Sequence, residues 1–349
     1  MEEKKMKKAL SMILALAMTM SLVACGGGSS STPAASTPAA SSTPAASEST
    51  EGGKAGGTNL TFTTGGETGT YYGFGNVIAN KVGDMTSTSV KAITSGGSAA
   101  NIQALEDGDA QLGFVQSDVM VYAYNGERTF AETGASTGFS TVANLYMEQV
   151  QVITVDPSIK TIADLAGKKV SVGAAGSGVF FNAVDVLGIY GLDVEKDIVP
   201  TYQSFGDSAE ALKDGQIDAA FIVAGAPTTA VTDLASGREI SVVSLDEEHI
   251  NDLIASSPYY SKAVIGKDVY GTAEDATTVA VGAVVIARDD VSEADVYNFL
   301  YGTFEDIAGL SHGKAAELSL DFAASVTSIG YHPGAVAYFA DKGLEVPAK

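Results

Sequence analysis

The sequence is poor in the residues that bind metals and nucleic acids. Its 349 residues include one cysteine, no tryptophan, three histidines and three arginines. One cysteine excludes a disulfide framework and a cysteine-cluster zinc site, and the three histidines lie far apart, so we expect no metal and no cofactor. Twenty Lys and Arg against 42 Asp and Glu give a net charge of −22. This argues against nucleic acid as a partner, because phosphates are neutralised by Lys and Arg.

Common catalytic motifs are also missing. The sequence has no GxSxG, no HExxH and no cysteine nucleophile pattern. Ser177 has no evident neighbouring base, and His332 is more typical of a structural histidine. The glycine-rich loops spell neither a P-loop, whose lysine is missing, nor GxGxxG. We therefore expect a protein that is not an enzyme.

The N-terminus is typical of a bacterial lipoprotein. Four lysines lie within the first eight residues, and the apolar run Ala9–Val23 is short for a membrane span but fits a signal peptide. The run ends at Leu22-Val23-Ala24-Cys25, which matches a lipobox. A plain signal peptide with a chance cysteine is the alternative. We expect residues 1–24 to be removed and Cys25 to be lipidated.

Cleavage before Cys25 changes the charge and leaves a tether. It removes four lysines and two glutamates, so the net charge of −22 becomes −24. Residues 25–57 are rich in Ser, Thr, Pro, Ala and Gly and include STPAASTPAASSTPAASEST, a composition that cannot bury a core. We expect an extracytoplasmic protein, held on the outer face of the cell membrane by its lipid alone.

The folded part contains a duplicated plan. IQALEDGDAQLGFV at 102–115 matches AEALKDGQIDAAFI at 209–222, each a helix that ends at a glycine and is followed by a buried strand. Each copy is preceded by a strand, a glycine-rich loop and a helix, at Leu60–Val82 and at Lys169–Tyr190. The alternation predicts two parallel α/β sheets with right-handed crossovers.

The order of these segments predicts two lobes. Val150–Val155 enters the second half and Val279–Ala287 returns from it, so lobe I is 58–150 plus 280–349 and lobe II is 151–279. Helical patterns at Glu293–Leu310 and Gly313–Ala324 are expected to pack on lobe I. Two separate domains joined by a single linker are the alternative.

Ligands of open α/β sheets bind at the carboxyl ends of strands, where several glycine-rich loops are expected to meet. They are GGETGTY at 65–71, SGGS at 95–98, QSD at 116–118, GSG at 176–178 and GAP at 225–227. Glycine lets a ligand approach the backbone, and the first N–H groups of a helix attract an anion. Tight turns with serine caps are the alternative. Because no arginine lies in these loops, we expect backbone N–H groups to hold a small organic anion, with contacts that include Gly66, Gly97, Ser117 and Val179.

Several of these motifs resemble one known family. GGETGTYYGFG at 65–75, TSGGSAANIQALEDGDAQLGFVQSD at 94–118, DLAGKKVSVGAAGSG at 164–178 and DGQIDAAFIVAGAPT at 214–228 resemble the TAXI family of solute receptors of TRAP transporters. The likeness extends from Thr58 to about Tyr301, and LYMEQVQVI at 145–153 resembles the family's segment before the hinge. The sequence departs from the family at Gly73, Met147 and the pair Val179-Phe180.

The resemblance implies a class II periplasmic-binding-protein fold, with two α/β lobes joined by a two-strand hinge. It implies delivery of a small carboxylate, glutamate or a related acid, to a sodium-coupled TRAP permease. A sensor that docks on a membrane histidine kinase is the alternative, and an orphan enzyme on the same fold is a third. We expect a monomer. By motif match, the ligand contacts are Thr70, Tyr71, Ser98, Asn101, Gln116, Ser177, Gly178, Gly225, Ala226 and Pro227.

Overall fold

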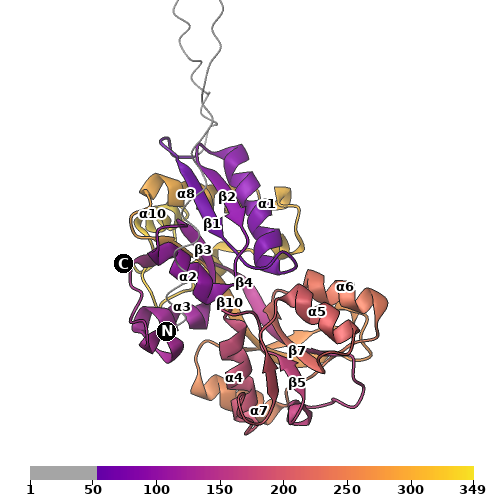
Figure 1. Cartoon of the computed structure of the whole chain (residues 1–349). Coiled ribbons are helices and arrows are strands. Elements are labelled where there is room, and N and C mark those ends of the chain that lie inside the picture. The colour runs from indigo at the N-terminus through magenta and orange to yellow at the C-terminus, as the bar shows by residue number, and fades with distance from the viewer. Residues whose placement is uncertain (1–52) are drawn as a thin grey trace, which may run out of the picture. The chain divides into compact units, whose positions relative to one another are not determined.

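The computed structural model describes residues 53–349, which belong to one compact unit. The predicted signal peptide, Cys25 and the tether up to residue 52 lie outside the described residues. Among the residues that are described, no helix is long and apolar enough to cross a membrane. Figure 1 shows the two α/β lobes of this unit, one above the other.

The first half of the duplicated plan has the predicted order of elements. It runs β1 (Asn59–Thr63), α1 (Thr70–Met85), β2 (Ser89–Ile93), α2 (Ser98–Glu106), β3 (Leu112–Gln116) and then α3 (Ser117–Asn125). Gly108, just after α2, has a φ of +80°, the left-handed conformation that glycine adopts without strain. One expectation was wrong: residues 116–118 are no loop, because α3 begins directly after β3.

The second half repeats this order. It runs β5 (Lys169–Ser171), α4 (Val179–Ile189), β6 (Val199–Thr201), α5 (Phe205–Lys213) and β7 (Ala219–Ala224). Gly215 ends α5 with a φ of +67°. The chain then adds α6 (Thr229–Gly237), β8 (Ser241–Val242), α7 (Glu247–Ser256) and β9 (Ser261–Ile265).

Two long strands connect the lobes. β4 (Phe139–Thr154) and β10 (Ala276–Arg288) pair antiparallel from Phe139↔Arg288 to Gln149↔Ala280. Together they produce the sheet order β2-β1-β3-β10-β4-β7-β5-β6, with β8 on β4 and β9 on β10. The fold is therefore the class II periplasmic-binding-protein fold, two α/β lobes joined by a two-strand hinge (Figure 1).

The C-terminal helices are shorter than expected. α8 is Glu293–Phe304, and Gly313–Ala324 is not one helix but a 3-10 helix at Gly313–Glu317 followed by α9 (Leu320–Ala323). The break occurs at Leu318, whose backbone is extended, and at Ser319, whose side chain accepts from Phe322 N and caps α9 instead. α10 (Pro333–Asp341) packs against α8.

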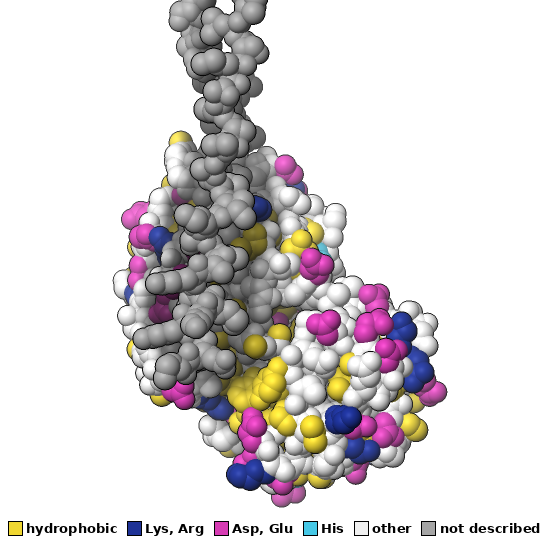
Figure 2. Space-filling model, in the orientation of Figure 1, with side chains coloured by type: hydrophobic (Ala, Val, Ile, Leu, Met, Phe, Trp, Pro, Cys, Tyr) yellow, Lys and Arg dark blue, Asp and Glu magenta, His cyan; other side chains and the backbone are white. Residues whose placement is uncertain are grey.

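The apolar side chains form separate cores. One core surrounds Phe62, Phe114 and Phe299 and contains residues from β1, β3 and α8, and two others lie around Val170 and Leu212. Figure 2 shows apolar side chains gathered where the two lobes meet. We propose the lobe boundaries given above, 58–150 plus 280–349 for lobe I and 151–279 for lobe II, with Val150 and Val281 of the hinge strands packed in the core around Val170.

Candidate functional site

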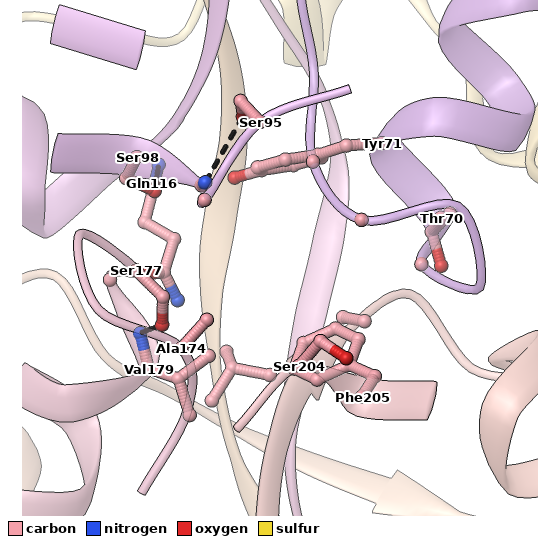
Figure 3. A pocket seen from close by; sticks show the side chains of 18 of the residues that line it. Thr70, Tyr71, Ser95, Ser98, Gln116, Ala174, Ser177, Val179, Ser204 and Phe205 are labelled. Carbon is pink, nitrogen blue, oxygen red and sulfur yellow. Dashed lines mark hydrogen bonds between the residues drawn. The ribbon is translucent and has the colours of Figure 1, made fainter. Parts of the chain in front are cut away.

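A cavity of about 70 Å³ lies between the two lobes. One water molecule needs about 10–15 Å³ of cavity volume. The cavity therefore has room for roughly five water molecules, which suits a small solute. Figure 3 shows its side chains converging from both lobes. The cavity is lined by Gly65, Gly66, Gly69, Thr70, Tyr71, Ser95, Gly96, Gly97, Ser98, Gln116, Glu148, Ala174, Ser177, Gly178, Val179, Ser204, Phe205, Val223 and Ala224.

Four helices begin at this cavity. The first residues of α1, α2, α4 and α5 are Thr70, Ser98, Val179 and Phe205, and all four line it. α1, α2 and α4 have no acidic residue in their first turn, whereas α7 and α8 each have two. The positive ends of the helix dipoles at α1, α2 and α4 are thus not offset by acids of their own first turns.

The two lobes touch on both sides of the cavity. Ala100 N donates to Gly176 O at 3.0 Å, and the Thr70 hydroxyl donates to Gly225 O at 2.8 Å. At the outer edge, Arg128 forms an ion pair with Asp185 at 2.7 Å. The structure is therefore a closed form, in which contacts between backbone, hydroxyl and charged groups hold the lobes together.

Nine of the fourteen predicted contact residues line the cavity. They are Gly66, Thr70, Tyr71, Gly97, Ser98, Gln116, Ser177, Gly178 and Val179. Their contacts with a ligand stay a prediction. The other five, Asn101, Ser117, Gly225, Ala226 and Pro227, are not among the lining residues.

Asn101 and Ser117 hold lobe I together instead. The Asn101 amide accepts from the Thr63 hydroxyl at 2.7 Å and donates to the carbonyls of Thr64 and Phe114, so it joins β1 to β3 below the cavity. The Ser117 hydroxyl accepts from Gly282 N at 3.0 Å and fastens α3 to β10. Both side chains satisfy buried backbone groups, which is a structural role.

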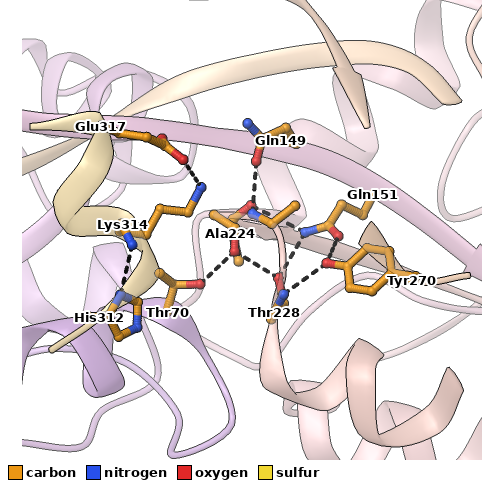
Figure 4. Close-up of polar contacts among 11 residues, drawn as sticks. Thr70, Gln149, Gln151, Ala224, Thr228, Tyr270, His312, Lys314 and Glu317 are labelled. Carbon is orange, nitrogen blue, oxygen red and sulfur yellow. Dashed lines mark hydrogen bonds and ion pairs between the residues drawn. The ribbon is translucent and has the colours of Figure 1, made fainter. Parts of the chain in front are cut away.

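The turn at 225–227 is occupied by contacts within the protein (Figure 4). Gly225 O accepts from the hydroxyls of Thr70 and Thr228, and Ala226 N donates to Gln149 Oε1. A Cβ on Gly225 would lie 2.4 Å from the Lys314 side chain. The packing of Lys314 from lobe I against this turn therefore requires a glycine at position 225.

Sequence reasoning missed several lining residues. Glu148 comes from the middle of β4, Ser204 and Phe205 from the start of α5, and Val223 and Ala224 from the end of β7. Ser204 offered a signal, because its side chain accepts from Asp207 N as a helix N-cap. The only signal for Glu148 was its place in LYMEQVQVI, where an acidic residue follows three apolar or aromatic ones.

Tyr71 and Glu148 are the ionisable side chains that line the cavity. The Tyr71 hydroxyl donates to Glu148 Oε2 at 2.6 Å, and the Tyr71 ring stacks on Phe114 with centroids 4.5 Å apart. Burial, more than any neighbour, raises the pKa of Glu148 well above its usual range and thereby favours its neutral form. Burial likewise raises the pKa of Tyr71, with Glu148 adding to the effect.

A buried polar network extends from the cavity toward α4. Gln116 Nε2 donates to Asn182 Oδ1 at 2.8 Å, and Asn182 Nδ2 donates to Asp118 Oδ2 at 3.0 Å and to the Tyr260 hydroxyl at 2.8 Å. Asp118 is 0% exposed. Burial raises the pKa of Asp118 to about 7, against the effect of its hydrogen bond from Val119 N.

The NMT1-like family model matches residues 62–343. The chain belongs to the NMT1-like family. Its two-lobed α/β fold is that of the class II periplasmic solute-binding proteins.

Solved structures of low sequence identity are also similar. The periplasmic aliphatic sulphonate binding protein SsuA from Escherichia coli is 19% identical over 75% of each chain, with a TM-score of 0.44. A putative L-cystine ABC transporter protein from Listeria monocytogenes is 15% identical over 78% of this chain and 99% of that chain, with a TM-score of 0.44. The GluR0 ligand-binding core from Nostoc punctiforme is 14% identical over 69% of this chain and 91% of that chain, with a TM-score of 0.40.

Replacing Gly178 with alanine should prevent closure. The added Cβ would lie 1.5 Å from Gln116 Oε1 and 3.0 Å from Ser98 Oγ, both on the opposite lobe. Overpacking of this kind costs about 1–3 kcal/mol, which would fall on the closed form alone. We expect small-angle scattering of the mature Gly178→Ala protein to give a larger radius of gyration than wild type. Gly188→Ala, on the same helix with open space around it, is the control, and equal radii for both variants would contradict the prediction.

Asp118 should make the protein less stable as the pH rises. The unfolded side chain has lost its proton by about pH 5, whereas the folded one retains it until about 7, so stability falls as the pH increases between these values. The shift corresponds to about 4 kcal/mol at most. Asp118→Asn keeps an acceptor for Asn182 but cannot ionise, so its unfolding free energy should gain on wild type from pH 5 to pH 8. Urea titrations at each pH measure the unfolding free energies, and Asp214→Asn, at an exposed position, is the control. A gain in stability of Asp118→Asn that is independent of pH would refute the prediction.

Proposed function

We propose that the mature protein is a lipid-anchored receptor that binds a small organic carboxylate between its lobes. In this proposal it delivers the ligand to a TRAP-type, sodium-coupled permease. The single observation that carries the ligand class is the convergence of four helix N-termini on one cavity. The TAXI resemblance of the sequence motifs supports the permease, and Leu22-Val23-Ala24-Cys25 supports the lipid anchor.

The cavity suits a carboxylate although no cation lines it. No Lys, Arg or His is among its lining residues, so the positive potential has to come from backbone N–H groups. Charge-assisted hydrogen bonds from such groups contribute about 1.5–3 kcal/mol each. In the proposal, two or three of them at the starts of α2 and α4 replace the ion pair that an arginine would provide.

Two negative features are compatible with an anionic ligand. Glu148 lies in the cavity, but its burial favours the neutral carboxyl, which does not repel an anion. The charge of −24 on the mature chain lies mostly on the solvated surface, where salt screens it. It therefore slows the encounter with an anion more than it weakens the closed complex.

The ligand class is tested on the mature protein. Mass spectrometry of the denatured protein identifies any small molecule that co-purifies, and calorimetry then compares small carboxylic acids with their neutral primary amides. We expect each acid to bind at least tenfold more tightly than its amide, because the amide loses the charge-assisted hydrogen bonds. Amides that bind as tightly as the acids would contradict the carboxylate site.

The permease is tested by uptake of the identified ligand in membrane vesicles. A sodium gradient without ATP should drive uptake that requires this protein. Uptake that requires ATP instead, or ligand-dependent phosphorylation of a histidine kinase without uptake, would overturn the proposed partner but not the ligand class.

Lipidation is tested at Cys25. Cys25→Ser should move the protein from the membrane fraction to the soluble fraction, because the thiol that takes the lipid is gone. The intact mass of the wild-type protein should show loss of residues 1–24 and added acyl chains. A variant that stays in the membrane, or a wild-type mass without acyl chains, would disprove the anchor.

A further inference from the structure

The chain enters lobe I through a short segment, residues 53–58, that α8 holds by its backbone. Asn298 of α8 is 0% exposed, and its side-chain amide pairs with both backbone groups of Lys54. Lys54 N donates to Asn298 Oδ1 at 2.6 Å, and Asn298 Nδ2 donates to Lys54 O at 2.9 Å. A side-chain amide offers the same donor and acceptor as a peptide group. Asn298 therefore acts as a neighbouring strand would and fixes the backbone of the segment.

Asp295 holds the other end of this segment. It is 1% exposed, and it accepts from Thr58 N and from the Thr58 hydroxyl, each at 2.8 Å. Asp295 and Asn298 are three residues apart and so lie on one face of α8. Without the segment, a buried carboxylate and a buried amide would both lose partners, which is unfavourable. The buried face of α8 is thus suited to holding residues 53–58.

The turn before β2 contacts the segment from a second side. The Ser87 hydroxyl donates to Lys54 O at 3.0 Å and accepts from Gly57 N at 3.1 Å. A Cβ on Gly57 would lie 2.4 Å from the carbonyl carbon of Ser87. That neighbour is backbone and cannot rotate away, so this close approach requires a glycine.

These contacts lie at the edge of lobe I that is opposite to the cavity. The segment and Ser87 precede β1 and β2, whereas the cavity lies at the carboxyl ends of the strands. In the sheet, β1 and β3 separate β2 from the hinge strands β10 and β4. Figure 1 shows β1, β2 and α8 in the part of lobe I that is farther from lobe II. All of the partners named above belong to lobe I.

We propose that Ser87, Asp295 and Asn298 form a clasp that fastens residues 53–58 to lobe I, so that lobe I is fixed to the anchor and lobe II is the lobe that moves. A hinge motion changes contacts between lobes but leaves contacts within one lobe as they are. The clasp itself does not depend on the proposed function. The membrane as the fixed point rests on the lipid anchor of the proposed function.

The clasp is tested by trypsin. Lys54 is the only Lys or Arg between Lys8 and Lys81, so cleavage there separates the tether from residues 55–349 in one step. A protease binds its substrate as an extended strand, through backbone groups of the kind that Asn298 occupies. Cleavage at Lys54 therefore requires release of the clasp. Intact mass during limited digestion of the mature protein measures its rate.

Three variants weaken the clasp to different degrees. We expect Gly57→Ala and Asn298→Leu to be cleaved at Lys54 at least tenfold faster than wild type, and Ser87→Ala about threefold faster. Gly57 and Ser87 lie outside the buried core, so their variants decide the outcome if Asn298→Leu does not fold. Gly138→Ala, a lobe I glycine with open space around its added Cβ, should match wild type. Equal rates in wild type and Gly57→Ala overturn the clasp.

An open form tests whether the clasp belongs to lobe I alone. The variant that scattering shows to be open is used, either Gly178→Ala or Arg128→Ala, which loses the ion pair to Asp185. Its cleavage at Lys54 should stay within about twofold of the wild-type rate. Faster cleavage would show that lobe II contributes to the clasp and would overturn the assignment of lobe I as the fixed lobe.

Trypsin on isolated membranes separates failure of the clasp from failure of the anchor. It should release residues 55–349 from Gly57→Ala and leave the wild-type protein in the membrane fraction. If the wild type is soluble before trypsin is added, the lipid anchor has failed, and slow cleavage at Lys54 in that soluble protein still supports the clasp. If trypsin releases a membrane-bound wild type as fast as Gly57→Ala, the clasp has failed and the anchor stands.

Discussion

The antiparallel pairing of β4 with β10 is the constraint on which the rest of the structure depends. Both strands run through both lobes, and their pairing from Phe139↔Arg288 to Gln149↔Ala280 sets where one lobe lies relative to the other. β3 pairs with β10 on one side, and β7 pairs with β4 on the other. The carboxyl ends of the parallel strands in each lobe therefore face the same space, and the helices that follow begin there.

This geometry makes a positive site in a strongly negative protein. Helix starts at Thr70, Ser98, Val179 and Phe205 bring the positive ends of four helix dipoles to a cavity that Lys, Arg and His do not line. Such dipoles act within about one helical turn, so they govern a ligand inside the cavity, whereas surface charge governs its approach.

Local patterns predicted the parts of the fold that local physics controls. The duplicated strand–loop–helix plan and the glycine ends of α2 and α5 follow from apolar periodicity and from the conformational freedom of glycine at Gly108 and Gly215. The first half of β4 was not predicted, because three of its buried residues, Ser140, Thr141 and Asn144, are polar. These polar side chains interrupt the run of apolar residues by which a buried strand is predicted. Their hydrogen-bond acceptors, such as Asp289 and Ile329 O, come from segments far away in the sequence.

The sequence by itself determined the class of the fold, the order of the elements and nine residues that line the cavity, because each depends on residues close together in the chain. The tertiary structure alone decided that Asn101 and the turn at 225–227 serve packing, and that Glu148 lines the cavity. It also brought Gln116 into contact with Asn182, which is 66 residues away. Contacts of this kind join segments that are far apart in the chain, so no local pattern of residues determines them.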